Sequence, residues 1–441
     1  MLDKFYKQFK SGTDIRGVAS EGVEGQPVNL TDDVVARMAD GFVLWLSKKV
    51  SKDPETLTIS IGRDSRISGP HIVSICSERF KRCGATVLDC SLASTPSMFM
   101  TTVDLGCDGA LQITASHHPF NRNGLKFFTR EGGLEGSDIE EILEYAQNGE
   151  SPAENSCGKI RKVDYMTDYA KGLCEKIKKE VNAEDYEHPL KGFKIVVDAG
   201  NGAGGFYADK VLSVLGADTT GSRYLEPDGM FPNHIPNPED ATAMASICEA
   251  VKEANADLGV IFDTDVDRGG AVDNKGNEIN RNRLVAVAAA IALEGNEGGT
   301  VVTDSITSSG LKEFIEDTLG GQHYRYRRGY KNVIDKALEL NAQGINCPLA
   351  IETSGHAAMK ENYFLDDGAY LCTKIIIKAA QLRKEGKELD ELTAALKEPV
   401  ESKEVRFKIL EPDFKACGEK IIGDLTAYAM AHDGWNVAND N

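Results

Sequence analysis

Three stretches of the chain share one local design, and this repetition constrains the fold more than any other feature. Residues 57–89, 193–221 and 299–326 each start with a short apolar strand, turn at Gly, Ser or Asp, and continue with a helical pattern. Each stretch then re-enters a strand after glycine, namely Gly84, Gly216, and Gly320 with Gly321. Strand, turn, helix and strand form the β-α-β unit, which builds parallel sheet. The sequence therefore predicts an α/β protein.

The distance between the copies predicts the domain organisation. The copies start at residues 57, 193 and 299, and this period is too long for a solenoid repeat. We expect three tandem related α/β domains with mixed sheets, followed by a partial α+β domain. The seams fall in a polar stretch, a DNKG turn and a charged region, which gives domains at residues 1–155, 156–275, 276–385 and 386–441.

Charge and cysteine content restrict the partners and the compartment. The chain has 69 Asp and Glu residues against 50 Lys and Arg residues, and the resulting net charge of −19 repels nucleic acid and anionic lipid. Its 10 cysteines include no C-x-x-C pair, which is typical of a reduced cytosolic chain. The longest apolar run, residues 284–293, is too short to span a bilayer and predicts a buried helix. We expect a cytoplasmic monomer or dimer that binds neither nucleic acid nor membrane.

A serine on a turn is the first candidate for chemistry. Within residues 109–128 an apolar strand precedes Ser116, and Pro119 restricts the turn that follows. Imidazoles and cations lie nearby in the sequence, at His117, His118, Arg122 and Lys126. A hydroxyl beside such groups can act as a nucleophile or phosphate carrier. A serine that only caps the turn is the structural alternative.

Three alternating aspartates form the second candidate. Asp263, Asp265 and Asp267 come directly after an apolar strand. Carboxylates held this close repel one another unless a cation lies between them, and oxygen ligands favour Mg²⁺. An EF-hand does not fit, because its Gly and Glu positions hold Arg268 and Asn274 here. The structural alternative is a solvated acidic turn.

A glycine-rich turn at residues 198–205 offers a dinucleotide fingerprint. Gly200, Gly202 and Gly205 satisfy G-x-G-x-x-G between a strand and a helix. No clear strand-ending acid follows at the expected distance, because Asp218 is early and Glu226 lies in a Pro-Gly turn. We therefore expect a structural tight turn.

Short polar side chains end another apolar strand within residues 348–370. Glu352, Ser354 and His356 lie on one loop, and this combination of acceptors and donors suits a polyhydroxyl ligand such as a sugar. A helix cap is the structural alternative.

Two weaker signals are cationic. Arg16 stands between Ile15 and Gly17, and the turn at residues 326–333 carries cations. The cations of that turn are Arg327, Arg328 and Lys331. A cationic turn in an acidic protein can serve an anionic ligand, and a solvated turn is an equal alternative.

Taken in order, these motifs resemble the α-D-phosphohexomutase family of phosphoglucomutases and phosphomannomutases. Residues 12–17 look like its early G-T-x-x-x-R-G-type motif, and residues 114–119 look like its phosphoserine motif T-A-S-H-N-P. Residues 263–268 look like its metal loop D-x-D-x-D-R, and residues 351–356 look like its sugar loop G-E-x-S-G-H. The resemblance covers nearly the whole chain and implies three related α/β domains.

The resemblance implies a role for each matching residue. Ser116 would carry the phosphoryl group, and a phosphate oxygen on it would join Asp263, Asp265 and Asp267 around Mg²⁺. The residues around the phosphate, which would help to move protons, would be Arg16, His117, Lys126 and Arg268. The residues on the sugar side would be Glu352, Ser354 and His356, with Lys331 contacting the ligand from the third domain.

The implied reaction interconverts hexose 1-phosphate and hexose 6-phosphate of mannose or glucose. It passes through a phosphoserine enzyme and a hexose 1,6-bisphosphate, which also serves as activator. The alternatives are a phosphoglucosamine mutase and a non-catalytic protein that binds sugar phosphates. A haloacid dehalogenase-type enzyme would use Asp263 as nucleophile and Asp366 with Asp367 as its later acidic pair, but it leaves the Ser116 segment unexplained.

The chain departs from the family pattern at three places. His118 replaces the usual Asn, and Ile351 replaces the Gly that often opens the sugar loop. No R-x-S-x-T-type phosphate loop precedes Asn441. After a predicted strand at residues 402–409 and a predicted helix at residues 413–431 the sequence soon ends, so we expect a chain cut short in its last domain, with weak turnover.

Overall fold

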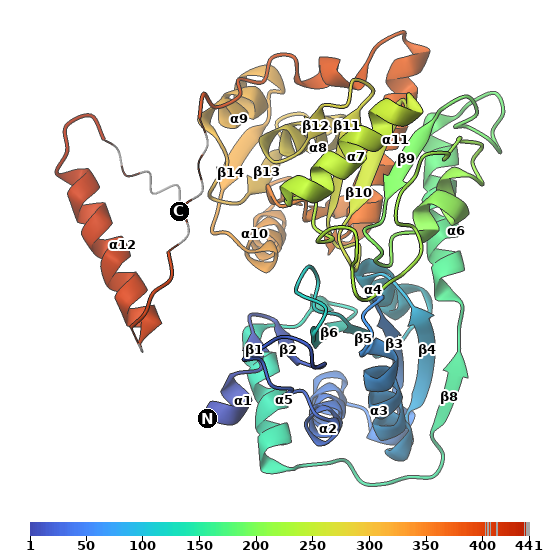
Figure 1. Ribbon diagram of the computed structural model, residues 1–441, viewed down its shortest axis with the longest axis vertical. Helices are drawn as coiled ribbons and strands as arrows, with labels where there is room; N and C mark the ends of the chain where they lie inside the picture. Colours follow the sequence, from blue (N-terminus) through green and yellow to red (C-terminus); the bar gives the residue numbers. More distant parts are fainter. Residues whose placement is uncertain (402, 404, 406, 412, 436, 438–441) are drawn as a thin grey trace.

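The computed structural model describes the whole chain except residues 402, 404, 406, 412, 436 and 438–441. Three sheets form in chain order, each with helices packed on it (Figure 1). This arrangement confirms the predicted α/β class with mixed sheets.

The first sheet contains the first predicted β-α-β unit. Its order is β1-β2-β6-β5-β3-β4-β8, with β7 paired to β6. The strands are β1 (Lys10–Ser11), β2 (Asp14–Val18), β3 (Thr58–Arg63), β4 (Thr86–Leu92), β5 (Gly109–Ile113), β6 (Arg122–Thr129), β7 (Gly132–Gly133) and β8 (Lys159–Lys162). β3 runs parallel to both β4 and β5, whereas β2 and β6 are antiparallel to their neighbours.

Helices cover both faces of the first sheet. The helical segments of this part are α1 (Lys4–Lys7), α2 (Asp32–Val50), η1 (Pro54–Thr56), α3 (Gly69–Arg82), α4 (Thr95–Asp104) and α5 (Gly136–Asn148). α2, α3 and α5 bury one face in an apolar core of their own. α4 contributes instead to a second core that continues through the other two sheets. The first sheet is therefore joined to the rest of the molecule by apolar packing.

The second sheet only partly follows its prediction. Its order is β12-β11-β10-β9, with β9 (Ile195–Asp198), β10 (Leu258–Phe262), β11 (Gly269–Asp273) and β12 (Glu278–Ile279). The helical segments are α6 (Tyr165–Val181), the π-helix η2 (Tyr207–Leu212) and α7 (Ala241–Ala254). The prediction of a return strand after Gly216 is wrong. In its place, Asp218 and Arg223 form isolated parallel bridges, to Lys194 just before β9 and to Asp198 at the end of β9. The polar residues between them form a turn that interrupts the pairing.

The third sheet confirms its predicted unit. Its order is β14-β13-β15-β16-β17, with β13 (Thr300–Thr303), β14 (Gln322–Arg325), β15 (Leu349–Ile351), β16 (Ala357–Met359) and β17 (Leu365–Asp366). The helical segments are α8 (Asn282–Leu293), α9 (Ser309–Glu313), η3 (Phe314–Thr318), α10 (Tyr330–Ala342), η4 (Lys360–Asn362), α11 (Gly368–Lys384) and η5 (Leu389–Thr393). α8 contains the apolar run at residues 284–293 and is almost wholly buried, as predicted.

The second and third sheets share one core and sit together in Figure 1, above the first sheet. β8 and α6 run along one side of the molecule and connect the first sheet to the others (Figure 1). No helix among the described residues is long and apolar enough to cross a membrane.

One helix, α12 (Phe414–Met430), stands apart from the sheets in Figure 1. It confirms the helix predicted for residues 413–431. The strand predicted for residues 402–409 lies partly outside the described residues, and the described ones among them are not in a strand. A partial α+β domain at this end stays a prediction.

The glycine-rich turn after β9 packs directly under the loop that follows β10. A Cβ atom at Gly202 would lie 2.5 Å from the Thr264 carbonyl oxygen, and the Ala203 amide donates to that same oxygen at 2.8 Å. Close packing between two backbone segments therefore explains the G-x-G-x-x-G pattern, in agreement with the predicted structural tight turn.

We expect the change Gly202→Ala to lower the free energy of unfolding by about 1–3 kcal/mol, because the added methyl group overpacks the contact with Thr264. Gly172→Ala is the matched control, since Gly172 lies in α6 with open space around it. That control should be neutral or stabilising by up to about 1 kcal/mol. Urea unfolding measures both variants, and equal losses would contradict the packing role.

Candidate active site

The candidate residues follow the carboxyl ends of strands from three different sheets. Ser116 comes shortly after β5, Asp263 directly after β10, and Glu352 directly after β15. These ends converge on one cleft of about 570 Å³. The predicted site residues that line it are Arg16, Ser116, His117, Lys126, Asp267, Arg268, Glu352, Ser354 and His356. Asp263, Asp265 and Lys331 are not among them.

Ser116 is buried at the tip of its turn. Its Oγ donates to Asp263 Oδ2 at 3.1 Å and accepts from Arg268 Nη2 at 2.9 Å, and His117 Nδ1 lies 3.3 Å away. The backbone φ of Ser116 is +50°, a left-handed conformation that costs free energy for a residue with a side chain. The surrounding structure must therefore hold this turn in place.

Arg66 stabilises the Ser116 turn through hydrogen bonds to its backbone carbonyls. It is fully buried, and its guanidinium donates to the backbone carbonyls of Ser116, His118 at 2.6 Å, Pro119 at 2.7 Å and Arg122 at 2.9 Å. Asp64 lies 3.2 Å from Arg66 Nε and accepts from Thr114 Oγ1 at 2.8 Å. This pair, supplied by the end of β3, braces the whole segment that carries Ser116.

The three aspartates form a buried cluster. Asp263, Asp265 and Asp267 place ligand oxygens within 4.8 Å of one another, and none of the three residues is more than 2% exposed. Oδ1 of Asp265 and Oδ1 of Asp267 have no hydrogen-bond partner among the residues that the structure describes. Buried acceptors without donors are costly, and a hard divalent cation would satisfy them. The oxygen-only set fits Mg²⁺.

The charges of this cluster are unevenly compensated. Burial and the neighbouring carboxylates Asp267 and Asp265 raise the pKa of Asp263 well above its usual range. Burial alone would raise the pKa of Asp267 too, but Lys126 and His356 lower it well below its usual range. Lys126 Nζ donates to Asp267 Oδ2 at 2.8 Å. The cluster is short of positive charge at Asp263 and Asp265.

The cations around Ser116 come from separate elements. Arg268 bridges Ser116 to Asn237, to which its Nη1 donates at 3.0 Å. Arg16, on β2, donates to Asp14 at 2.9 Å, and Lys126, on β6, lies 4.7 Å from the ring centre of Tyr330. Burial and Arg268 lower the pKa of His117 to about 3, so its imidazole is neutral.

The loop after β15 is tied together by His356. Its Nδ1 lies 3.0 Å from Ser354 Oγ and 3.3 Å from Glu352 Oε2. The other oxygen of Glu352 accepts from the Gly329 amide at 2.6 Å. The loop therefore presents a hydroxyl and a carboxylate whose orientations are held by neighbours.

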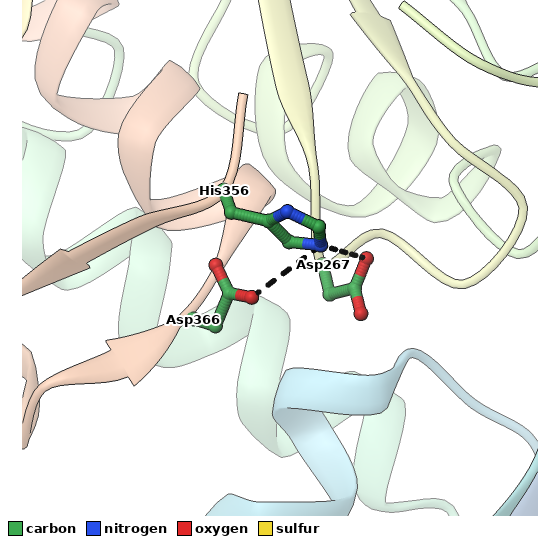
Figure 2. Close-up of side chains that lie close together, drawn as sticks. All are labelled: Asp267, His356 and Asp366. Carbon is green, nitrogen blue, oxygen red and sulfur yellow. Dashed lines mark ion pairs between the residues drawn. The ribbon is translucent and has the colours of Figure 1, made fainter. Parts of the chain in front are cut away.

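His356 also lies between two carboxylates, as Figure 2 shows. Its Nε2 is 3.5 Å from Asp267 Oδ1 and 3.6 Å from Asp366 Oδ2. Burial alone would lower the pKa of His356, but Asp366 and Asp267 raise it to about 10, so the imidazole is charged at neutral pH. This trio could also hold a metal ion by geometry. Mg²⁺ prefers oxygen ligands, so the three-aspartate set suits it better.

Lys331 lies outside the cleft. Its ammonium pairs with Glu135 from the first sheet region and with Asp335 one helical turn along α10. It lines a smaller neighbouring cavity of about 80 Å³, whereas Tyr330 lines both cavities. A ligand contact from Lys331 stays a prediction, and the geometry offers Tyr330 in its place.

Sequence reasoning missed several residues that build the site. Asp64 and Arg66 directly follow β3, and β3 pairs with β5, so the strand-end rule could have placed them beside Ser116. Two further residues carry no comparable signal: Thr95, whose hydroxyl donates to Asp265, begins α4, and Asn237, which accepts from Arg268, lies in a loop distant in sequence.

Comparisons with known proteins identify the class. Models of the phosphoglucomutase/phosphomannomutase family match its α/β/α domain I at residues 7–153, domain II at residues 168–276 and domain III at residues 280–400. A phosphomannomutase/phosphoglucomutase of Pseudomonas syringae pv. tomato is 30% identical over 371 residues, covering 83% of this chain and 75% of the relative. The chain therefore belongs to the phosphoglucomutase/phosphomannomutase family.

Further relatives have related names. A phosphoglucomutase of Neisseria meningitidis serogroup A is 29% identical, covering 82% of this chain and 73% of the relative. A phosphoglucosamine mutase of Lactobacillus helveticus is 29% identical, covering 88% and 81%. The crystal structure of a phosphoglucomutase/phosphomannomutase family protein from Burkholderia thailandensis superposes with a TM-score of 0.72 at 25% identity, covering 91% of this chain and 81% of that chain.

We expect Arg66→Lys to destabilise the protein by about 1–3 kcal/mol, because a single ammonium leaves several buried carbonyls of the Ser116 turn without donors. Arg37→Lys is the control: Arg37 forms a surface pair with Asp33 on α2, and its change should stay within about 0.5 kcal/mol. Denaturant unfolding tests both variants, and a loss at Arg66 no larger than at Arg37 would refute the bracing role.

Proposed function

We propose that this chain interconverts the 1- and 6-phosphates of a hexose, mannose or glucose, with Ser116 as the phosphate carrier. One observation carries the proposal: the Ser116 hydroxyl contacts Asp263 and Arg268 beside aspartate oxygens that lack donors. A nucleophilic hydroxyl, a cation-binding cluster and a guanidinium thus meet at one point. The family membership of the chain supports a phosphohexomutase.

The metal requirement follows from the same cluster. Asp263, Asp265 and Asp267 would hold Mg²⁺ together with a phosphate oxygen on Ser116. When bound, Mg²⁺ neutralises charge on the phosphoryl group and helps to orient it.

The proposed transfer starts from phosphorylated Ser116. The bond between phosphorus and Ser116 Oγ breaks while phosphorus bonds to the free hydroxyl oxygen of a hexose monophosphate. The hydroxyl proton leaves, Ser116 Oγ regains a proton, and the product is a hexose 1,6-bisphosphate. The sugar then turns round, and its other phosphate returns to Ser116 by the reverse step. The overall reaction therefore moves a phosphate without consuming a co-substrate.

Charge compensation is the task of the cations around Ser116. A phosphoserine carries about −1.5 to −2 at neutral pH, in addition to the aspartates. Arg268, Arg16 and Lys126 already face this region, and phosphoryl transfer depends mainly on positioning and charge stabilisation. The Nδ1 atom of neutral His117 accepts from Arg268 and lies 3.3 Å from Ser116 Oγ, so His117 is our candidate for passing the proton.

The sugar side uses the loop after β15. Glu352 can accept from sugar hydroxyls and Ser354 can donate or accept, while charged His356 holds both side chains in place. The name of the Lactobacillus helveticus relative makes glucosamine phosphate the alternative substrate. The dehalogenase-type alternative is less suitable, because Asp367 caps α11 and accepts from Tyr169 instead of facing Asp263.

The activity test is a coupled assay across glucose, mannose and glucosamine 1-phosphates, each with its 1,6-bisphosphate as activator. We expect turnover of glucose or mannose phosphate and a phosphate on Ser116 in peptide mass spectra. Ser116→Ala should lose turnover by on the order of 10³-fold or more, since the phosphate carrier is removed. Ser213→Ala, at an exposed site, should behave as wild type. Phosphate on another residue, with Ser116 unmodified and activity intact, would refute the mechanism.

We further expect Asp265→Asn to weaken Mn²⁺ or Mg²⁺ binding by at least about tenfold, equivalent to about 1.4 kcal/mol. Without the metal the variant should be as stable as wild type or more so, because burial and Asp267 raise the pKa of Asp265 and so disfavour its charge. Asp209→Asn, on an exposed surface, is the control. Calorimetric titration measures the affinity, and unchanged binding in Asp265→Asn would exclude this metal site.

A further inference from the structure

Besides His356, five lysine and arginine side chains line the cleft, and they differ in how closely carboxylates pair with them. Three have close carboxylate partners: Arg16 with Asp14 at 2.9 Å, Lys126 with Asp267 at 2.8 Å, and Arg268 with Asp263 at 3.3 Å. The other two are Arg281 and Arg328. None of the contacts around Ser116 involves either of these two arginines.

Arg281 and Arg328 have no close carboxylate partner among the described residues. The Arg328 side chain is 49% exposed, and its Nη2 lies 4.0 Å from Glu239, at the limit of an ion pair. Arg281 is exposed and forms no ion pair or side-chain hydrogen bond within the described part of the chain. Guanidinium groups that are not committed to a carboxylate can bind phosphate bidentately.

The backbone of Arg281 is held in a disfavoured conformation. It has φ +50° and ψ −124° at the start of α8, outside the regions that residues with side chains normally occupy. Asn280 supports it: its Oδ1 accepts from the Arg281 amide at 2.8 Å, and its Nδ2 donates to the Pro238 carbonyl at 3.1 Å. Strain that the surrounding structure maintains is typical of functional positions.

Arg281 and Arg328 both border the loop at residues 235–240, which lines the cleft just before α7. Arg281 is linked to it through Asn280 and Pro238, and Arg328 through Glu239. The Glu239 carboxylate also lies 3.9 Å from Arg268, so this anionic group sits between two arginines. An anion that takes the place of the Glu239 carboxylate at this edge of the cleft would therefore meet guanidinium groups from more than one direction.

We propose that Arg281 and Arg328 bind the phosphate of the hexose phosphate that is not being transferred. This inference rests on the proposed function, which requires a ligand with phosphates at both ends. The cations near Ser116 are committed to the aspartates and the reacting phosphate, so the second phosphate needs other partners. A cleft of about 570 Å³ lies within the usual size range of ligand sites and has room for a hexose bisphosphate.

The test compares neutral variants with a matched neighbour. Arg281→Gln and Arg328→Gln each remove one charge from the cleft. Arg327→Gln removes the same charge next door, where Arg327 stacks on Tyr326 and does not line the cleft. All are made in a Ser116→Ala background, so that no phosphate is transferred during calorimetric titration with glucose 1,6-bisphosphate. We expect at least about tenfold weaker binding in the two cleft variants and less than about twofold change in the control.

A second variant separates binding from structure. Arg281→Gly relieves the backbone conformation, so it should raise the melting temperature while still weakening bisphosphate binding. Bisphosphate affinities of the cleft variants equal to that of Arg327→Gln would overturn the inference and leave the proposed function standing. A parent protein that neither binds the bisphosphate nor phosphorylates Ser116 in its wild-type form would overturn both.

Discussion

The buried carboxylate cluster is the constraint on which the rest of the site depends. Three aspartates of one loop cannot all stay charged in the interior without cations, and the loop itself supplies only Arg268. Lys126 comes from the first sheet and His356 from the third, and both face Asp267. Buried ion pairs of this kind contribute little net stability. Their presence is better explained by the chemistry of the cleft, which needs three sheets to meet at one point.

Much of the site could be predicted because its residues follow one rule. Ser116, Asp263 and Glu352 each come after an apolar strand, and a strand ending in polar residues is visible in sequence. Arg66 also follows an apolar strand, but it was not predicted, because it binds backbone carbonyls and a pattern of side chains does not indicate such contacts. Arg281 was missed because its backbone conformation has no sequence signature.

The differences from the sequence-based expectations also have physical causes. The strand expected after Gly216 failed because polar turn residues interrupt the hydrogen-bond ladder after a single bridge. The ligand contact of Lys331, which the resemblance implies, stays a prediction; in the structure Lys331 lies outside the cleft because Glu135 and Asp335 are near enough to pair with it. Which carboxylate a long lysine side chain pairs with depends on distances in the folded structure, and a sequence motif does not contain these distances.

The backbone joins two of the three site loops more firmly than the third. Gly269, which directly follows the aspartate loop, donates a backbone hydrogen bond to the Gly355 carbonyl of the loop after β15 at 3.2 Å, and a Cβ atom at Gly355 would lie 2.5 Å from Gly269 O. The Ser116 turn contacts the aspartate loop through side chains, and the Thr95 amide of the first sheet region adds one backbone hydrogen bond to the Asp265 carbonyl at 2.8 Å. Under the proposed function, a sugar bound by the loop after β15 would therefore keep its position relative to the three aspartates. A movement of the first sheet would change the distance to Ser116 before it changed the distance between the aspartates and the sugar.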